Sequence, residues 1–344
     1  MKKVFILTAV FVLLGIAAQA DVFNLGAGLT NLEMVTVGDP GNAADTRLWY
    51  GTSTWGSVGY TYNIGKYEVT AAQYCDFLNH KAKSDPYGLY NTAMDTAVNQ
   101  YGCNIKRSGA SDNYTYSVAS DWANRPVNCV SYWNTCRFIN WLNNGQGNGS
   151  TETGAYTLNG YTGNDGHTVQ RNTEAKWFLP TEDEWYKAAY YQGGGTNADY
   201  WLYPTQSNTE PSQTVTTPDA GNNANFYTDA AGYSIGAPYY RTNVGEFENS
   251  ESAYGTYDQG GNVWEWNETI RNYDGTYTFR FATGGAFNYS GSSTSAWSAL
   301  AGNPTISVYA GGFRVAEAVP EPSSILGILS GIAGLGGMAL RKRK

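Results

Sequence analysis

Tyr257-Asp258-Gln259-Gly260-Gly261-Asn262-Val263-Trp264-Glu265-Trp266 is the stretch that decides the fold, because it is an oxygen-rich loop that runs into two tryptophans. Asp258 and Glu265 supply carboxylates, and the two glycines between them allow the backbone to turn sharply. If the backbone after the glycines is extended, the carbonyl groups of Gly261 and Val263 point the same way. Calcium prefers several oxygen ligands, so the loop is a candidate cation site. The alternative is a glycine turn that enters an aromatic strand, with Glu265 facing solvent.

Other short blocks occur in order on both sides of this loop. They are Tyr67-Glu68-Val69-Thr70, Arg125-Pro126-Val127-Asn128 with Val130-Ser131-Tyr132, Leu179-Pro180-Thr181-Glu182-Asp183-Glu184-Trp185, Gly284-Gly285-Ala286-Phe287 and Gly312-Phe313-Arg314-Val315-Ala316. Together with the loop, they resemble the formylglycine-generating enzyme family, which is also called the sulfatase-modifying factor family. The resemblance runs from Tyr60 to Ala316. It implies a single compact α+β domain related to C-type lectins, rich in loops and low in regular secondary structure.

The resemblance also implies two calcium sites, each built from side-chain and backbone oxygens. In the second site the further carboxylate is the least defined ligand, because the intervening loop is shorter here than in the enzymes. The residues implied are Asp258, Gly261, Val263 and Glu265 for the first site, and Asn225, Phe226 and Asp229 for the second.

The block after Gly284 shows whether the oxidase chemistry of this family is retained. Family members that make formylglycine bind copper there through two cysteines, since copper(I) requires soft thiolate ligands. In this sequence the two positions fall on or near Tyr289 and Thr294, and no cysteine occurs after Cys136. We therefore expect no copper and no catalysis by that route, and we assign no catalytic residue. The residues expected to line the former active-site groove are Asn288, Tyr289, Ser292, Ser293, Thr294 and Trp297.

Other catalytic chemistries find little support in the sequence. A related branch of the family, which forms sulfoxides, holds iron with histidines and a carboxylate in an added helical domain. This chain has only two histidines, His80 and His167, and no such added domain. It also lacks a nucleophile elbow, a glycine-rich phosphate loop and a His-Glu-x-x-His motif.

The first twenty residues predict a secretory signal peptide. Lys2-Lys3 is followed by the apolar run Val4–Ala17 and then by Ala18-Gln19-Ala20, a pattern typical of cleavage before Asp21. The apolar run is too short to span a bilayer comfortably. The folded domain is then expected to occupy residues 21–318.

The C-terminal segment, residues 319–344, combines three features of a sorting signal. Pro320-Glu321-Pro322 precedes an apolar segment, residues 325–340, and a basic end, Arg341–Lys344. At about 1.5 Å per residue the apolar segment covers roughly 24 Å, which is marginal for a bilayer core of about 30 Å. The tail resembles the PEP-CTERM sorting signal, which implies an exosortase-type processing enzyme as a partner. The alternative is an ordinary single-pass membrane anchor.

The charge of the chain argues against nucleic-acid binding. The whole sequence has 21 basic and 29 acidic residues. Without the two terminal signals it loses six basic residues and one acidic residue, which leaves 15 against 28 and a net charge of −13. So acidic a surface repels phosphate backbones and suits an exported protein that meets divalent cations.

Four cysteines lie in the first half of the chain. An exported protein can form disulfides, and four cysteines allow three pairings. We expect Cys75 to pair with Cys136 and Cys103 to pair with Cys129. No Cys-x-x-Cys motif occurs, so a zinc site has little support.

Three short helices are predicted by their N-terminal caps. In each, a serine or threonine precedes apolar residues at three- and four-residue spacing, and in two of them a glutamine or glutamate completes a capping box. The helices are Ala71–Leu78 behind Thr70, a helix through Leu142 behind Ser131, and Trp185–Tyr191 behind Thr181.

These observations favour an exported, non-catalytic, calcium-stabilised scaffold that is sorted to the cell envelope or extracellular matrix. Tyrosine and tryptophan faces beside short polar side chains suit sugar rings, so the groove predicts an exopolysaccharide ligand. Two alternatives remain open. One is a purely structural matrix protein whose groove is filled by its own side chains, and the other is an enzyme of the family with altered active-site chemistry.

Overall fold

The computed structural model describes most of the expected domain, namely Phe23, Leu25, Leu29 and residues 31–48, 53–272 and 278–319. The expected signal peptide, the apolar segment 325–340 and the sorting residues Pro320, Glu321 and Pro322 lie outside these residues. Within the described ranges, no helix has the length and apolar character needed to cross a membrane.

Short helices and short strands alternate with long loops, which confirms the expected α+β fold. The helices are α1 Ala71–Lys81, α2 Ser120–Ala123, α3 Tyr132–Asn143 and α4 Glu182–Tyr190, with 3-10 turns η1 Thr92–Met94, η2 Gly195–Asn197 and η3 Gly291–Thr294. The strands are β1 Met34–Val37, β2 Tyr62–Gly65, β3 Lys106–Ser108, β4 Thr115–Ser117, β5 Trp177–Phe178, β6 Tyr191–Gly193, β7 Asp199–Tyr200, β8 Tyr227–Thr228, β9 Gly232–Tyr233, β10 Trp264–Asn272, β11 Thr278–Thr283, β12 Ala299–Gly302, β13 Gly311–Gly312 and β14 Ala316–Ala318.

The three predicted helices are confirmed, with their caps. Thr70 and Thr181 each form a complete capping box, and the Ser131 side chain accepts the N–H of the third residue after it. The third helix begins at Glu182, directly after its cap, and ends at Tyr190 because the next residue starts β6. The sequence did not reveal α2, whose N-cap residue is an alanine that cannot supply a capping side chain.

Two four-stranded sheets organise the described chain, and they meet near its C-terminal end. The first has the order β1-β2-β14-β5 and is antiparallel, so a C-terminal strand lies between a strand near the N-terminus and one from the middle of the chain. The second has the order β12-β11-β10-β13, in which β10 and β13 are parallel. Because β13 belongs to one sheet and β14 to the other, the connecting residues Phe313–Val315 pass from one sheet to the other.

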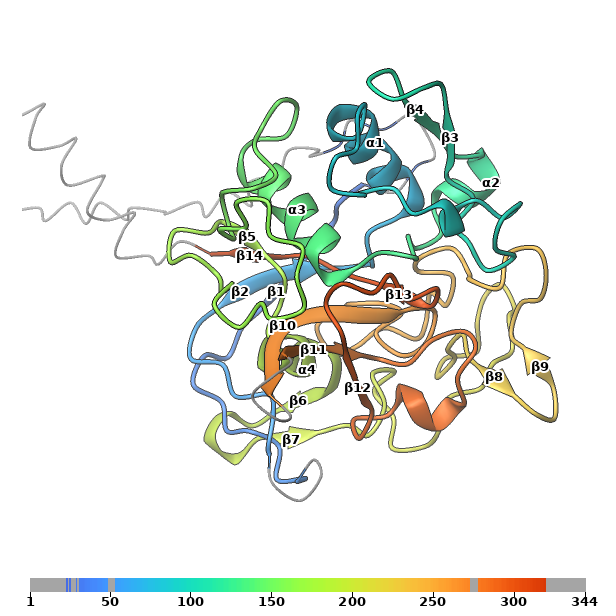
Figure 1. Cartoon of the computed structure of the whole chain (residues 1–344). Coiled ribbons are helices and arrows are strands. Elements are labelled where there is room, and N and C mark those ends of the chain that lie inside the picture. The colour runs from blue at the N-terminus through green and yellow to red at the C-terminus, as the bar shows by residue number, and fades with distance from the viewer. Residues whose placement is uncertain are drawn as a thin grey trace, which may run out of the picture.

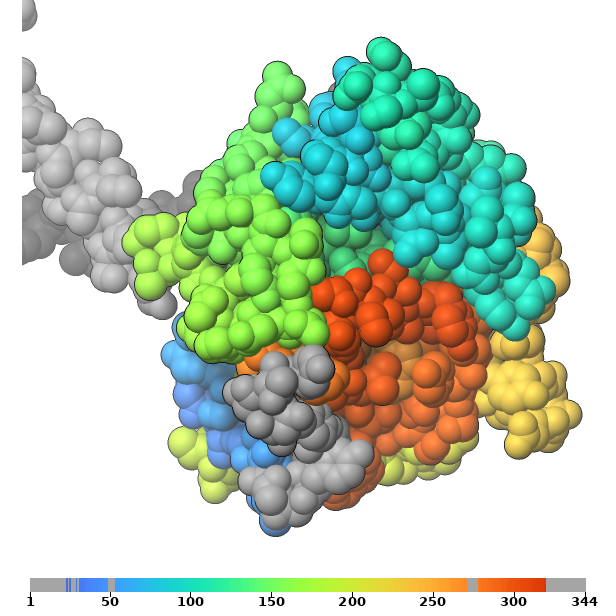
Figure 2. Space-filling model, in the orientation of Figure 1, coloured from blue at the N-terminus to red at the C-terminus, as the bar shows by residue number. Residues whose placement is uncertain are grey.

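Figure 1 shows how these elements are distributed. Helices α1 and α2 and the hairpin β3–β4 gather at the top of the view, β10 crosses the middle, and the hairpin β8–β9 lies at the right edge. In Figure 2 the C-terminal part of the domain, coloured orange to red, occupies the centre of the visible face. The groove residues predicted from the sequence belong to this part.

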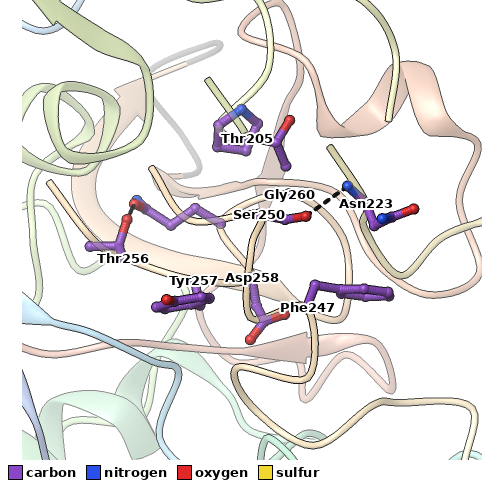
Figure 3. Close-up of a pocket in the computed structure, with 10 residues that line it drawn as sticks. Thr205, Asn223, Phe247, Ser250, Thr256, Tyr257, Asp258 and Gly260 are labelled. Atoms are coloured by element: carbon purple, nitrogen blue, oxygen red, sulfur yellow. Dashed lines mark hydrogen bonds between the residues drawn. The ribbon is translucent and has the colours of Figure 1, made fainter. Parts of the chain in front are cut away.

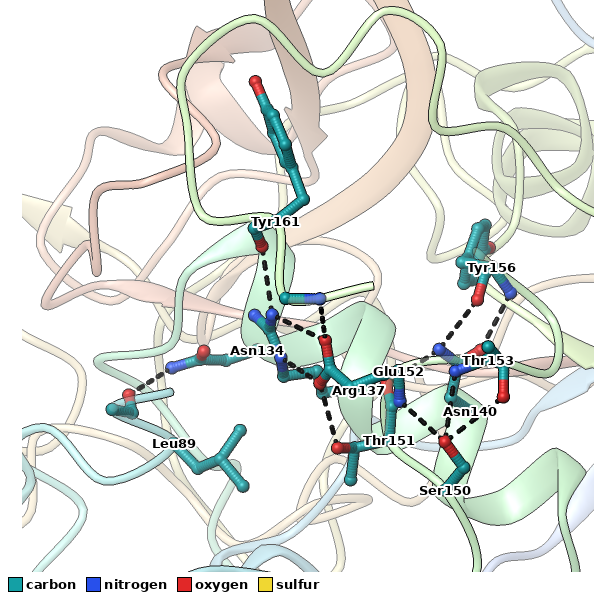
Figure 4. A network of polar contacts seen from close by, with 12 residues as sticks. Leu89, Asn134, Arg137, Asn140, Ser150, Thr151, Glu152, Thr153, Tyr156 and Tyr161 are labelled. Atoms are coloured by element: carbon teal, nitrogen blue, oxygen red, sulfur yellow. Dashed lines mark hydrogen bonds and ion pairs between the residues drawn. The ribbon is translucent and has the colours of Figure 1, made fainter. Parts of the chain in front are cut away.

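The glycine- and asparagine-rich stretch after α3 is held to that helix by polar contacts (Figure 4). Arg137 forms an ion pair with Glu152, with 2.8 Å between Nε and Oε1, and donates to the carbonyl oxygen of Tyr161 at 3.0 Å. Asn140 donates to the carbonyl oxygens of Thr151 and Tyr156 at 2.8 and 2.9 Å. These side chains supply the hydrogen-bond donors that a neighbouring strand would otherwise provide, because buried backbone carbonyls need donors.

The cysteine pairing expected from the sequence is corrected by the structure, since all four cysteines are free thiols. Cys136, on α3, neighbours Tyr132 and Arg280, whereas the cysteine that lies near Cys75 is Cys103. The helices α1 and α3 therefore turn their thiols toward different neighbours, and a helix-to-helix disulfide is not formed.

Candidate functional site

Glu265 is fully buried and paired with Arg314, which rules out the alternative in which it faces solvent. The guanidinium binds both carboxylate oxygens, with Nε 2.5 Å from Oε2 and Nη2 2.6 Å from Oε1. The indole N–H of Trp185 also donates to Oε2, at 2.7 Å. A bidentate pair of this kind is among the strong charge-assisted hydrogen bonds.

The burial follows from the position of β10 inside its sheet. The start of β10 pairs with β11 on one side and with β13 on the other, and the side chains of Trp264–Asn267 are all buried. Arg314 also donates to the carbonyl oxygens of Gly65 and Tyr257, both at 2.9 Å. The arginine thus joins the loop Tyr257–Val263, which we call the decisive loop, to β2 and β10.

Asp258 lies half-buried at the start of the loop, where its Oδ2 accepts the N–H of Gly245 at 2.6 Å. Burial raises the pKa of its carboxyl to about 7, although that hydrogen bond and the charge of Arg314 act to lower it. The backbone after it is not extended as assumed, because Gly261 and Asn262 have φ values of 93° and 58°. Regular strand structure begins only at Trp264.

The glycine at position 261 is required by a close approach between two chain segments. A Cβ atom there would lie 2.2 Å from the carbonyl oxygen of Asn225. That oxygen accepts the N–H of Asn262 at 2.8 Å, and Asn225 and Gly261 form a parallel bridge. The two calcium loops expected from the sequence therefore meet.

The residues of the second expected site lie in unlike environments. The Asn225 side chain is buried and donates to the carbonyl oxygen of Tyr240 at 3.0 Å, while its Oδ1 has no hydrogen-bond partner among the described residues. Phe226 is buried beside it. Asp229 is exposed in the turn between β8 and β9, and no hydrogen bond links it to Asn225 within the described chain.

The fit of these residues to calcium is partial. The carboxylate of Asp258 and the unpartnered Oδ1 of Asn225 are hard oxygen donors of the kind that calcium binds. Glu265, by contrast, is already neutralised by Arg314. In the part of the chain that the structure describes, no group of three or more His, Cys, Asp or Glu side chains is arranged to hold a metal ion.

A small cavity lies beside the loop (Figure 3). Its volume is about 10 Å³, and its lining includes Asn223, Ser250, Thr256 and Asp258. Figure 3 shows Asp258 on the side of Phe247, opposite Thr205. A volume of this size holds about one water molecule, so the cavity is too small for a substrate.

The predicted groove residues divide into exposed and packed side chains. Ser292 and Trp297 are exposed. Tyr289 packs its ring edge-on against Trp264 with centroids 5.2 Å apart, and Asn288 donates to the hydroxyl of Tyr309 at 3.2 Å. Ser293 is half-buried, whereas Thr294 is fully buried.

Thr294 therefore does not line an open groove. Its hydroxyl donates to the carbonyl oxygen of Gly291 at 2.7 Å, inside the turn η3. The prediction that Thr294 faces a ligand is wrong, because the turn folds its short side chain back onto its own backbone.

Three tyrosines near Asn288 were not predicted from the sequence, because they come from distant segments. Tyr309 is 45% exposed and stacks on Tyr101 with centroids 5.7 Å apart and an interplanar angle of 29°. The hydroxyl groups of Tyr101 and Tyr233 are 3.3 Å apart. We call Tyr101, Tyr233 and Tyr309 the tyrosine platform. The Oδ1 atom of Asn288 beside it is buried without a hydrogen-bond partner among the described residues.

The four thiols are buried and poorly suited to redox chemistry. Burial raises the pKa values of Cys75, Cys129 and Cys136 to about 12, and it also raises the pKa of Cys103. A thiol that stays protonated is a weak nucleophile and a weak metal ligand. In the described chain, the polar contacts of these thiols do not include Tyr289.

Comparison with known proteins identifies the family. The model described as "Sulfatase-modifying factor enzyme 1-like domain" matches residues 52–319. Among solved structures, "Crystal Structure of CarF" is similar with a TM-score of 0.53 and 19% identity, over 84% of this chain and 99% of that one. "Treponema denticola variable protein 1" is similar with a TM-score of 0.52 and 18% identity, over 85% of this chain and 97% of that one.

These structural likenesses concern the fold alone, and no curated protein sequence matches the chain. The family match, in contrast, covers more than half of the sequence. The chain therefore belongs to the family of sulfatase-modifying factor enzyme 1-like domains, whose α+β fold it adopts.

Proposed function

We propose that this chain is a non-catalytic member of its family that is exported, stabilised by calcium and bound to exopolysaccharide in the cell envelope or extracellular matrix. The observation that carries the proposal is the state of Tyr289 and Thr294. These residues stand on or near the positions where the family's oxidases carry copper-binding cysteines, and both are used for internal packing.

The thiols of the chain support a non-catalytic role. Each of them is buried, and burial raises its pKa. A copper(I) site requires two thiolates that converge on one point. In the described residues, the side chains around Tyr289 supply an indole, amides and hydroxyls instead.

The tyrosine platform supports sugar binding. The exposed ring of Tyr309 offers a flat apolar face, and Tyr101 beneath it fixes the orientation of that face. Sugar rings present apolar C–H faces, so an exposed aromatic face is complementary to them. The amide N–H of Asn288 donates to the Tyr309 hydroxyl at 3.2 Å and helps to hold that ring in place.

Export and sorting rest on the terminal sequences. The signal peptide over residues 1–20 directs the chain out of the cytoplasm, and the Pro320-Glu321-Pro322 tail brings it to an exosortase-type enzyme. The segment 325–340 holds the chain at the membrane before processing. An acidic domain of this kind remains soluble outside the cell and attracts calcium.

Calcium would be held by Asp258 with backbone carbonyl groups of the decisive loop. When bound, the ion supplies positive charge and oxygen coordination that join loop segments. The loop residues themselves bring Asn225 and Gly261 together through a backbone bridge, while Asp258 accepts the N–H of Gly245.

Affinity electrophoresis through gels that contain neutral polysaccharides (a glucan, a galactan and a mannan, one per gel) tests the ligand assignment. We expect retardation of the wild-type domain by at least one of them. Tyr309→Ala should weaken binding about tenfold, as expected for the loss of one stacking contact worth about 1.4 kcal/mol. Leu48→Ala, which removes an exposed apolar side chain that is not part of the platform, is the matched control.

The outcomes separate the competing functions. Retardation by none of the polysaccharides would contradict exopolysaccharide binding and favour a purely structural matrix protein. Formation of formylglycine from a Cys-x-Pro-x-Arg peptide, with copper and oxygen supplied, would contradict the non-catalytic role.

A further inference from the structure

Glu68 carries a buried carboxylate whose oxygen atoms accept no hydrogen bond from the part of the chain that the structure describes. The residue is 2% exposed, and among the described residues neither Oε1 nor Oε2 has a partner. It lies two residues before Thr70, the N-cap of α1, and so belongs to the block Tyr67–Thr70 of the family resemblance. An ionised carboxylate in such a place is strongly disfavoured unless a proton or a cation neutralises it.

Two backbone hydrogen bonds bring Glu68 to the decisive loop. The N–H of Tyr257 donates to the carbonyl oxygen of Lys66 at 2.8 Å, and the N–H of Val69 donates to the carbonyl oxygen of Phe313 at 2.9 Å. The residues that follow Tyr257 and Phe313, an aspartate and an arginine, therefore flank Glu68.

Three carboxylates thus lie within electrostatic reach of a single guanidinium. Burial raises the pKa of Glu68 well above its ordinary value, and the charges of Asp258 and Glu265 raise it further, while Arg314 lowers it. The hydrogen bonds of Arg314 go to Glu265 and to backbone carbonyl oxygens, and none reaches Glu68. With its carboxylates ionised, the cluster has two negative charges in excess.

We propose that Glu68 is a ligand of the calcium ion, together with Asp258, in place of Glu265, whose carboxylate is held by Arg314. This inference rests on the calcium of the proposed function and changes its ligand set. A divalent cation cancels the excess of two negative charges, and calcium suits donors that are all oxygen atoms. The cation also accounts for a carboxylate that is buried without a hydrogen bond.

The test compares the purified full-length chain with Glu68→Gln and Glu182→Gln. Glu182 is a matched control, because it is also buried but bonds to Asn267 and has Asp183 as its charged neighbour. Tm is measured in EDTA and in increasing calcium chloride, with magnesium chloride in parallel. Terbium luminescence, excited through nearby rings such as Tyr67 and Tyr257, gives the affinity directly.

We expect calcium at a hundredfold excess over its Kd to raise Tm by about 4 °C in the wild type and in Glu182→Gln. In Glu68→Gln the affinity should fall about tenfold or more, and stability in EDTA should be at least that of the wild type. If Glu68→Gln does not fold, Glu68→Asp keeps the charge but withdraws the carboxylate, and it must weaken calcium binding as well.

Two outcomes would overturn the assignment in different ways. If Glu68→Gln binds calcium as tightly as Glu182→Gln, then Glu68 is not a ligand, although calcium binding itself stands. If the wild type shows neither a Tm shift nor terbium luminescence, then the calcium of the proposed function fails as well.

Discussion

Single buried carboxylates in this domain differ in what neutralises them. Burial alone would raise the pKa of Glu184, but the charge and hydrogen bonds of Arg171, 2.7 Å away, bring it below its ordinary value. The charged group that acts on Glu182 within the described residues is Asp183, an acid rather than a cation. The Oε2 atom of Glu182 accepts the amide N–H of Asn267 at 2.6 Å, and burial raises the pKa of this glutamate to about 8. Two glutamates of one helix turn therefore have pKa values that are shifted in opposite directions.

Glu182 makes stability depend on pH. Between its ordinary pKa of 4.5 and about 8, the folded state keeps a proton that the unfolded chain has lost. Stability should therefore fall as pH rises through this window, by up to about 1.4 kcal/mol per pH unit. Glu182→Gln keeps the oxygen that Asn267 bonds and should remove this contribution to the slope, while that of Asp258, whose pKa burial raises to about 7, remains.

Urea unfolding at several pH values between 5 and 8 measures the effect. The exposed Glu174→Gln variant serves as the control, and its slope should match that of the wild type. An unchanged slope in Glu182→Gln would show that this carboxyl does not stay protonated in the fold.

Helix α4 has a complete capping box at its N-terminus. The Thr181 hydroxyl accepts the N–H of Glu184 at 3.1 Å, and Oε2 of Glu184 accepts the N–H of Thr181 at 2.6 Å. The same glutamate pairs with Arg171, so the capping box also links the helix to the loop that precedes it.

Thr181→Ala should lower the free energy of unfolding by about 1 kcal/mol, because the first turn of α4 loses a hydrogen-bond acceptor. Chemical denaturation of this variant and of Thr216→Ala, which changes an exposed loop threonine, measures the difference. If Thr181→Ala lowers the free energy of unfolding no more than Thr216→Ala does, then tertiary packing alone stabilises the start of the helix.

At the scale of the whole molecule, four buried thiols report on global unfolding. Each cysteine is at most 6% exposed, and together they belong to the largest hydrophobic cluster described. A thiol reagent reaches such groups only when the surrounding core opens. The thiols therefore probe the cooperativity of the domain as one unit.

The folded chain should not react with Ellman's reagent on the timescale of minutes, whereas all four thiols should react in guanidinium chloride. Ser292→Cys places a thiol at an exposed position and should react at once, which makes it the control for reagent access. Fewer than four reactive thiols after denaturation would reveal a disulfide and contradict the free state seen here.

Part of the fold could be predicted from local sequence. The three capped helices were predicted, because a cap and its helix lie within a few residues and their hydrogen bonds depend on little else. The strands were not placed, because many of them have only two to four residues and carry no alternation to detect. The two expected disulfides were wrong, because thiol separation depends on how helices pack.

The sequence by itself determined the family, through ordered blocks, and the absence of cysteines after Cys136. Only the tertiary structure decided that Glu265 pairs with Arg314, 49 residues away, and that the Glu68 carboxylate beside them accepts no hydrogen bond from the described residues. It also decided that Tyr101 and Tyr309 form one surface. The physical reason is that capping acts between neighbours in the chain, whereas the partner of a buried charge or an aromatic ring is chosen by which segments the sheets bring together.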